Sequence, residues 1–295
     1  MTLTRLVNGS ISASITSDGQ LVSIQKKDHE YMHGGGKPED LKDPQDKIGW
    51  DKSEIIMFPI IGRPGENIVS MNGKKYSMGQ HGISRAIPSH IEDVINTSGE
   101  NNNKNNDFAL ICQSHNGESI NNPRYDKDPS AAQKLEWPPY LIDKSIQVLP
   151  SAVRVGITVQ NLSDSNMKYR LGWHPAFRMQ GTNDDAVFKT MNSKSTGHNT
   201  IYMNEIIEES LTGAYLIDNV DSISYIDRKS ERGVQLAFEG FNSAMMWTKS
   251  AKSGMFCIEP VTQLPDKKRN YLDDVTHETL ASSERKQYLV HIIPI

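Results

Sequence analysis

The sequence predicts an all-β protein, a large antiparallel β-sandwich or barrel with very little helix. Residues 152–160 alternate apolar and polar side chains, which is the period-2 pattern of a strand with one buried face. About a dozen or more such short runs follow one another, separated by turn-forming residues, and almost no segment has helical periodicity. Regularly spaced short strands of this kind indicate antiparallel sheets packed against each other.

The length and composition favour one large globular unit. The chain has 295 residues, of which 36% are hydrophobic and 23% charged, enough to build a sizeable core. The length alone suggests about two domains of typical size, but large β folds often reach about 250 residues as one unit. We therefore expect a single domain over residues 1–295.

Charge and hydropathy exclude several classes of partner. The net charge of −4 and the lack of a lysine/arginine block argue against a nucleic-acid binder. No apolar run approaches the roughly 20 residues of a membrane span, and the first residues lack a signal-peptide core. Cys112 and Cys257 lie in apolar strand-like runs and are interpreted as reduced core thiols of a cytoplasmic protein, with a disulfide between them as the alternative.

Turn signals divide the chain into its expected elements. Asn72-Gly73 is a strong hairpin signal between two short strands. The polar run 98–107 is interpreted as an exposed loop between strands. A short helix is expected around 129–135, and mixed short strands and turns over 178–232.

A histidine marks the end of one predicted strand, residues 167–173. The alternation places Trp173 on the apolar face, which favours core packing, and His174 on the polar face. Pro175 is expected to end the strand, because proline cannot donate to a ladder. From its position alone, His174 is either a hydrogen-bonded histidine at a strand end or a functional group.

The segment 254–260 repeats this arrangement near the other end of the chain. An apolar strand leads to Glu259, and Pro260 follows at once. Glu259 is either a solvated glutamate at a strand end or the partner of a functional histidine.

Three further polar residues follow apolar or hairpin segments. The apolar run from Ile55 ends at Gly62 and Arg63, whose guanidinium either forms a surface ion pair or grips hydroxyls at a pocket edge. The hairpin at residues 67–78 leads into a segment that holds His81 and Arg85. The alternative for His81 is a purely structural hydrogen bond.

Four segments together resemble the aldose 1-epimerase (galactose mutarotase-like) superfamily, and most closely its bacterial mutarotase-like branch. They are 58–63 (FPIIGR), 80–85 (QHGISR), 172–177 (GWHPAF) and 257–260 (CIEP), and the likeness extends from about residue 10 to the C-terminus. The resemblance implies one large β-sandwich of the galactose mutarotase-like type, with the sugar site on a concave sheet face. It also implies His174 as general acid, Glu259 as general base, and Arg63, His81 and Arg85 as substrate-binding residues.

The implied reaction is the interconversion of the α and β anomers of a free aldose. A base takes the proton of the C1 hydroxyl while an acid protonates the ring oxygen, so both groups must contact one sugar. Unperturbed pKa values of about 4.3 and 6.5 make glutamate the base and leave histidine partly protonated at neutral pH. Trp50 is a candidate for stacking on an apolar sugar face. No cofactor and no metal is expected, and the expected partner is a monosaccharide bound by a monomer or weak homodimer.

Three alternatives remain open on the same residues. A hexose-6-phosphate 1-epimerase would use Arg85 or Arg63 to bind the phosphate. A carbohydrate-binding protein would keep the cavity without turnover. A metal-dependent enzyme would use His81, His174 and Glu259 as two histidines and one carboxylate.

Overall fold

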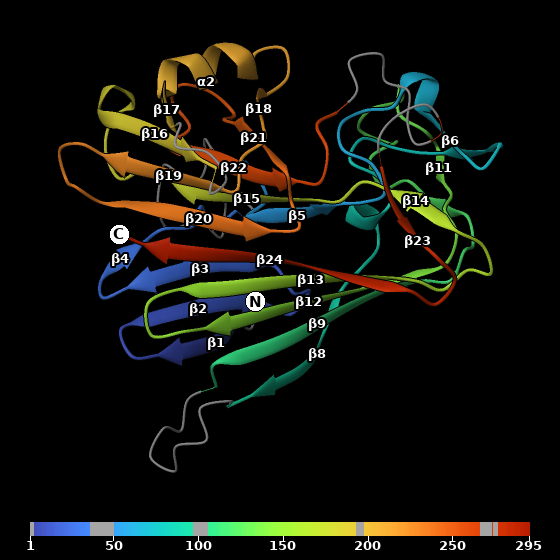
Figure 1. The fold of residues 1–295 in the computed structure, drawn as a ribbon, viewed down its shortest axis with the longest axis horizontal. Helices are drawn as coiled ribbons and strands as arrows, with labels where there is room; N and C mark the ends of the chain where they lie inside the picture. Colours follow the sequence, from blue (N-terminus) through green and yellow to red (C-terminus); the bar gives the residue numbers. More distant parts are fainter. Residues whose placement is uncertain (1–2, 36–49, 97–105, 193–197, 266–272, 274–276) are drawn as a thin grey trace.

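The computed structural model describes residues 3–35, 50–96, 106–192, 198–265, 273 and 277–295 (Figure 1). The strands are β1 (Leu3–Asn8), β2 (Ile11–Thr16), β3 (Leu21–Lys26), β4 (His29–Glu30), β5 (Glu54–Met57), β6 (Ile68–Met71), β7 (Lys74–Ser77), β8 (His90–Ile95), β9 (Phe108–His115), β10 (Ile120–Asn121), β11 (Lys134–Leu135), β12 (Tyr140–Val148), β13 (Val153–Asn161), β14 (Met167–Tyr169), β15 (Gly172–Arg178), β16 (Ala186–Met191), β17 (His198–Tyr202), β18 (Tyr215–Asp218), β19 (Ser222–Asp227), β20 (Gly233–Glu239), β21 (Ser243–Trp247), β22 (Met255–Val261), β23 (Glu278–Leu280) and β24 (Arg285–Pro294). The helical segments are η1 (Gly65–Asn67), η2 (Ser84–Ala86), η3 (Asn183–Asp185) and α2 (Met203–Ser210).

The largest sheet is antiparallel and has nine strands in the order β17-β16-β19-β20-β24-β13-β12-β9-β8. Figure 1 shows these strands following one another across the molecule. At its centre, β12 pairs with β13 from Tyr140 opposite Asn161 to Val148 opposite Val153. The apolar residues of β13 at alternate positions are buried, which confirms the one-sided strand predicted over 152–160.

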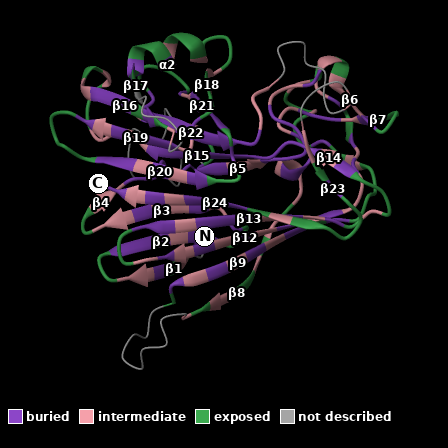
Figure 2. Cartoon of the chain, in the orientation of Figure 1, coloured by how far each residue is buried: buried purple, intermediate pink, exposed green. Residues whose placement is uncertain are grey.

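A second sheet of five strands, β18-β21-β22-β15-β5, packs against the first. Phe256 of β22 contacts Phe188 of β16 and Tyr225 of β19, with ring centroids 5.1 and 4.5 Å apart. Figure 2 shows buried residues along both sheets. The predicted all-β sandwich is confirmed, and one face of the five-stranded sheet remains available to build a site.

One apolar core joins the sheets. It includes Leu6 of β1, Trp173 of β15 and Ile292 of β24, so both ends of the chain contribute to it. The four-stranded sheet β1-β2-β3-β4 contributes its apolar side chains to the same core. The assignment of residues 1–295 to one domain stays a prediction.

A buried carboxylate connects three of these sheets. Glu54 of β5 accepts hydrogen bonds from the backbone N–H of Leu21 in β3, from the Lys144 ammonium of β12 at 2.5 Å, and from the Trp173 indole of β15. Glu54 and Lys144 are 3% and 6% exposed, so this ion pair is almost entirely removed from water. Trp173 is therefore a core residue, as its position in the alternation predicted.

The predicted hairpin at Asn72-Gly73 is confirmed. Both residues have positive φ, 54° and 74°, as the two central residues of a type I′ turn require. The hairpin joins β6 and β7. The loop expected at 98–107 falls mostly outside the described residues.

Several predicted elements are wrong. The segment 129–135 contains turns and β11 instead of a helix, and α2 forms within the region expected to hold only short strands and turns. The strand expected over 167–173 is divided into β14 and β15, because β14 leaves the five-stranded sheet to pair with β23. Pro175 and Pro260 lie inside β15 and β22 and do not end them.

The helices of the described chain are short. The α-helix α2 has 8 residues. Among the described residues, no helix has the length and apolar character needed to cross a membrane.

Removing the Lys144 ammonium should strongly destabilise the fold. Lys144→Ala leaves the Glu54 carboxylate buried without its cation, and breaking a buried pair in this way costs about 3–5 kcal/mol. Urea unfolding followed by tryptophan fluorescence measures this loss. Lys189→Ala, at an exposed position of β16, is the control and should change stability by about 0.5 kcal/mol or less. Equal stability of the two variants would contradict this role of Lys144.

Candidate active site

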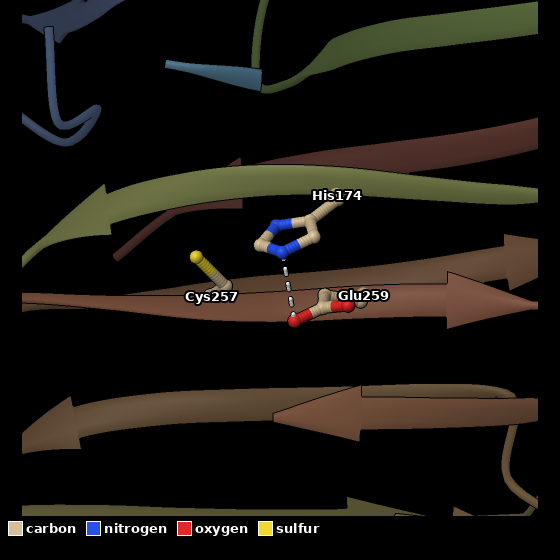
Figure 3. Close-up of side chains that lie close together, drawn as sticks. All are labelled: His174, Cys257 and Glu259. Atoms are coloured by element: carbon tan, nitrogen blue, oxygen red, sulfur yellow. Dashed lines mark ion pairs between the residues drawn. The ribbon is translucent and has the colours of Figure 1, made fainter. Parts of the chain in front are cut away.

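The pairing of β15 with β22 brings the histidine and the glutamate together. Gly172 lies opposite Val261 and Ala176 opposite Cys257. The same antiparallel register places His174 directly opposite Glu259, and residues two apart on a strand share a face. Figure 3 shows the two side chains pointing toward each other from these strands. Residues 85 positions apart therefore meet because of strand pairing.

The two side chains form a buried pair. His174 Nε2 lies 3.3 Å from Glu259 Oε1. The residues are 6% and 1% exposed. His174 Nδ1 and Glu259 Oε2 are buried and have no hydrogen-bond partner in another described residue. These two atoms of the pair are thus available to a ligand.

Burial shifts both groups of the pair toward their neutral forms. It lowers the pKa of His174 to about 3, and the positive charge of Arg85 adds to this effect. It raises the pKa of Glu259 to about 8. At neutral pH the imidazole is therefore uncharged and the carboxyl group keeps its proton. This is the reverse of the ionisation expected from unperturbed pKa values, because the sequence does not show how deeply the pair is buried.

Two tryptophans pack around the imidazole. The Trp50 ring lies 4.6 Å from the His174 ring at an interplanar angle of 31°, and Trp247 lies 5.9 Å away at 73°. Trp247 belongs to β21 and lies opposite Cys257 in β22. These rings hold the imidazole in place and line the cavity beside it. Trp50 was considered from the sequence, whereas Trp247 was missed because only the β21–β22 register brings it here.

His81 approaches the pair from a tight loop. Its backbone has a positive φ of 64°, and its Nδ1 accepts a hydrogen bond from the Gly62 N–H at 3.2 Å. Its ring lies 5.8 Å from that of His174. Burial, with Arg85 next in importance, lowers the pKa of His81 well below its usual value, so this histidine is neutral. Its Nε2 lies 3.2 Å from the side-chain amide nitrogen of Gln80, so both ring nitrogens have a partner.

Gly82 allows this loop to approach the segment that follows β5. A Cβ atom at Gly82 would lie 1.9 Å from the carbonyl oxygen of Phe58, and its φ is +85°. Both the space and the backbone angle require glycine. The two segments singled out in the sequence, 58–63 and 80–85, therefore form one wall of the site.

Arginines occupy the rim of the cavity. Arg63 forms an ion pair with Asp128, and its side chain is 36% exposed. It therefore forms the surface ion pair considered from the sequence, and it also lines the cavity. Arg85 donates a hydrogen bond to the Gln80 carbonyl at 3.4 Å. Burial and the nearby charge of Arg124 lower the pKa of Arg85 to about 10. Arg124 was missed from the sequence, because the irregular segment around it carries no motif.

These groups enclose a cavity of about 720 Å³ on one face of the five-stranded sheet. His174 and Glu259 form part of its floor, and all five residues selected from the sequence line it. The lining residues are Trp50, Ile55, Gly62, Arg63, Gln80, His81, Arg85, Arg124, His174, Thr212, Gly213, Ala214, Leu216, Met245, Trp247, Glu259 and Pro265. A volume of this size suits a small organic ligand.

Several solved structures share this architecture over the full chain. A galactose mutarotase-like protein from Lactobacillus casei ATCC 334 has a TM-score of 0.75 and 19% identity, with 100% of both chains covered. A galactose mutarotase related enzyme from Lactobacillus acidophilus has a TM-score of 0.72 and 16% identity over 100% of this chain and 97% of that one. The chain has the galactose mutarotase-like fold. A GalM/aldose epimerase homologue from C. elegans is also similar, with a TM-score of 0.60 and 11% identity over 100% and 98% of the chains.

The galactose mutarotase-like fold predicted from four short segments is thus confirmed. No family model matches the sequence, and no curated protein matches it either. At these identities the similarity is one of fold. On this galactose mutarotase-like fold, the buried pair and the cavity must be interpreted from their own chemistry.

Because the pKa of Glu259 is raised in the folded state, the protein should become less stable as the pH rises from about 6.5 to 8. In the folded state its pKa is about 8, against 4.5 when unperturbed, so folding retains a proton that the unfolded chain has lost. This contribution is full below pH 4.5 and is lost as the pH rises through 8. Below pH 6.5 the lowered pKa of His174 works in the opposite direction and offsets it. The net loss is then about 2 kcal/mol.

Urea unfolding at pH 6.5 and at pH 8 measures this loss. Glu259→Gln, which cannot ionise, should remove most of the difference. Glu239→Gln changes the same residue type at an exposed position of β20 and should keep it. A Glu259→Gln protein with the wild-type pH dependence would contradict the raised pKa.

Proposed function

We propose that the protein is an aldose 1-epimerase, which interconverts the α and β anomers of an aldose by opening and closing the sugar ring. The observation that carries the proposal is the His174–Glu259 pair, buried at 3.3 Å on the floor of the cavity. One histidine and one carboxylic acid supply the donor and acceptor that a hemiacetal needs. The fold and the aldose epimerase homologue that shares it support the same reaction.

The proton transfers balance within the pair. The carboxyl proton of Glu259 first passes to His174 Nε2, 3.3 Å away, which forms the ion pair. Glu259, now a carboxylate, takes the proton of the C1 hydroxyl, and protonated His174 gives one to the ring oxygen as the C1–O bond breaks. Opening thus leaves a neutral imidazole and a protonated carboxyl group, which is the arrangement that burial favours. After rotation about the C1–C2 bond, the reverse transfers close the ring and restore the ion pair. The burial of the pair therefore stabilises the protein groups in the open-chain state.

The walls of the cavity supply groups for binding the ring. His81 and its side-chain partner Gln80 line the cavity beside the pair, and Arg63 lies at the rim with donors for sugar hydroxyls. Trp50 and Trp247 offer flat apolar surfaces beside the imidazole, suited to the C–H face of a sugar. We propose a monosaccharide as the partner. The free thiols of Cys112 and Cys257 support a reducing, cytoplasmic location.

A phosphorylated aldose is the second candidate substrate, and the arginines favour it. Arg85 and Arg124 line the same cavity and form no ion pair among the described residues, whereas Arg63 is already paired with Asp128. Guanidinium groups bind phosphate oxygens with two parallel hydrogen bonds. A phosphate at the far end of the sugar would then contact Arg85 and Arg124 while C1 lies at the pair.

Removing either member of the pair should abolish the reaction. His174→Asn and Glu259→Gln should each lower anomer exchange by about 10²- to 10⁴-fold, the usual contribution of one positioned acid or base. NMR saturation exchange between the anomers of galactose, glucose and glucose 6-phosphate measures the rate. His90→Asn, at an exposed position of β8, is the matched control and should keep full activity. A wild-type protein that binds sugars without exchange would instead be a carbohydrate-binding protein.

Arg124 should distinguish the two substrate classes. Arg124→Gln should raise KM for glucose 6-phosphate by about tenfold or more, because a hydrogen bond to a charged group contributes about 1.5–3 kcal/mol. KM for unphosphorylated glucose should change little. Arg285→Gln, exposed on β24, is the control for charge alone. Equal effects of Arg124→Gln on both substrates would remove the phosphate role.

A further inference from the structure

One cysteine beside the pair has no part in the proposed reaction. Cys257 is a free, fully buried thiol on β22, two residues before Glu259. Residues two apart on a strand face the same side, so the thiol and the carboxyl group share the face that His174 approaches from β15. Figure 3 shows the sulfur on the same side of the strands as the other two groups.

The three side chains converge closely. One donor atom from each of His174, Cys257 and Glu259 lies within 4.8 Å of the other two. Zinc binds nitrogen, oxygen and sulfur at about 2.0–2.3 Å, which places tetrahedral ligands about 3.3–3.8 Å apart. The His174–Glu259 separation of 3.3 Å already fits, and the sulfur needs to move closer by at most about 1.3 Å.

An independent observation also points to a ligand at this position. Glu259 Oε2 is a buried oxygen without a hydrogen-bond partner in another described residue. Such an atom carries a desolvation cost, which a bound cation would offset. The carboxyl group can thus turn toward a metal without giving up a hydrogen bond from Oε2.

The charges of the donor set suit a divalent ion. A thiolate, a carboxylate and a neutral imidazole together carry two negative charges, so bound Zn²⁺ would form an overall neutral unit. Neutrality suits a buried site and limits repulsion from Arg85, the charged residue that acts on His174. The thiol and the carboxyl group would each release their proton to solvent. Two of the three ligands, His174 and Glu259, line the cavity, so a water or a sugar hydroxyl would be the fourth ligand.

We propose that His174, Cys257 and Glu259 form a three-ligand site for Zn²⁺. The set differs from the metal alternative considered for the sequence, because Cys257 takes the place of His81. Occupancy would engage the nitrogen and carboxylate that the proposed reaction uses, so zinc should inhibit anomer exchange. That consequence rests on the proposed function, whereas the binding does not.

Binding is tested on the full chain with zinc alone and with Co²⁺ as its spectroscopic substitute. Titration against a chromogenic chelator should give one Zn²⁺ per chain, and Co²⁺ should give a thiolate-to-metal charge-transfer band. Cys257→Ala should abolish the band and weaken Zn²⁺ binding by more than the roughly 10–100-fold typical of losing an outer partner. Cys112→Ala removes the other cysteine, on β9, and should change neither result.

Two results would overturn the site: a Co²⁺ complex of the wild-type protein without a thiolate band, or unchanged Zn²⁺ affinity in Cys257→Ala. In the activity assay, zinc should inhibit the wild-type protein at concentrations that leave Cys257→Ala active. Loss of zinc binding in Cys257→Ala with equal inhibition of both proteins would refute the inhibitory consequence. A wild-type protein without exchange activity would refute the proposed function and leave the binding result standing.

Discussion

The carboxylate of Glu54 is the interaction on which the site most depends. It lies behind the strand that carries His174 and accepts hydrogen bonds from Leu21, Lys144 and Trp173, which belong to three different sheets. Because Glu54 lies opposite Pro175 in the β5–β15 pair, these bonds fix β15 next to His174. Trp173 points into this network, and the alternation of the strand then turns His174 to the other face, into the cavity.

Burial acts differently on the two faces of this strand. Behind it, the Glu54 carboxylate lies 2.5 Å from an ammonium group and accepts two further hydrogen bonds, so a charge is compensated there. In front, His174 and Glu259 contact each other and line the cavity. Burial there lowers the pKa of His174 and raises that of Glu259, so the neutral form of each group is favoured. The first environment stabilises the fold. The second keeps one proton ready to move, and it also leaves lone pairs that a cation could use.

The sequence predicted what depends on local pattern. The alternation over 152–160, the Asn72-Gly73 hairpin and the opposite faces of Trp173 and His174 follow from strand geometry within a few residues. It could not predict that Trp247 and Arg124 reach the cavity, because their places depend on pairing and loop packing across the fold. The pKa values of the pair are of the same kind, since they depend on burial by distant segments. The motif resemblance supplied the association of His174 with Glu259 that periodicity alone could not.

The two prolines were expected to end their strands because proline cannot donate to a ladder, and their actual place shows how the pair is held. Because Pro175 and Pro260 have no N–H, the β15–β22 ladder is interrupted between Gly172 and Ala176. The outer neighbours compensate: His174 is paired with Ile55 of β5, and Glu259 with Met245 of β21. Each catalytic candidate is thus fixed from its outer side, with Trp50 and Trp247 packed around the imidazole. The interruption of the ladder therefore lies at the level of the His174–Glu259 pair.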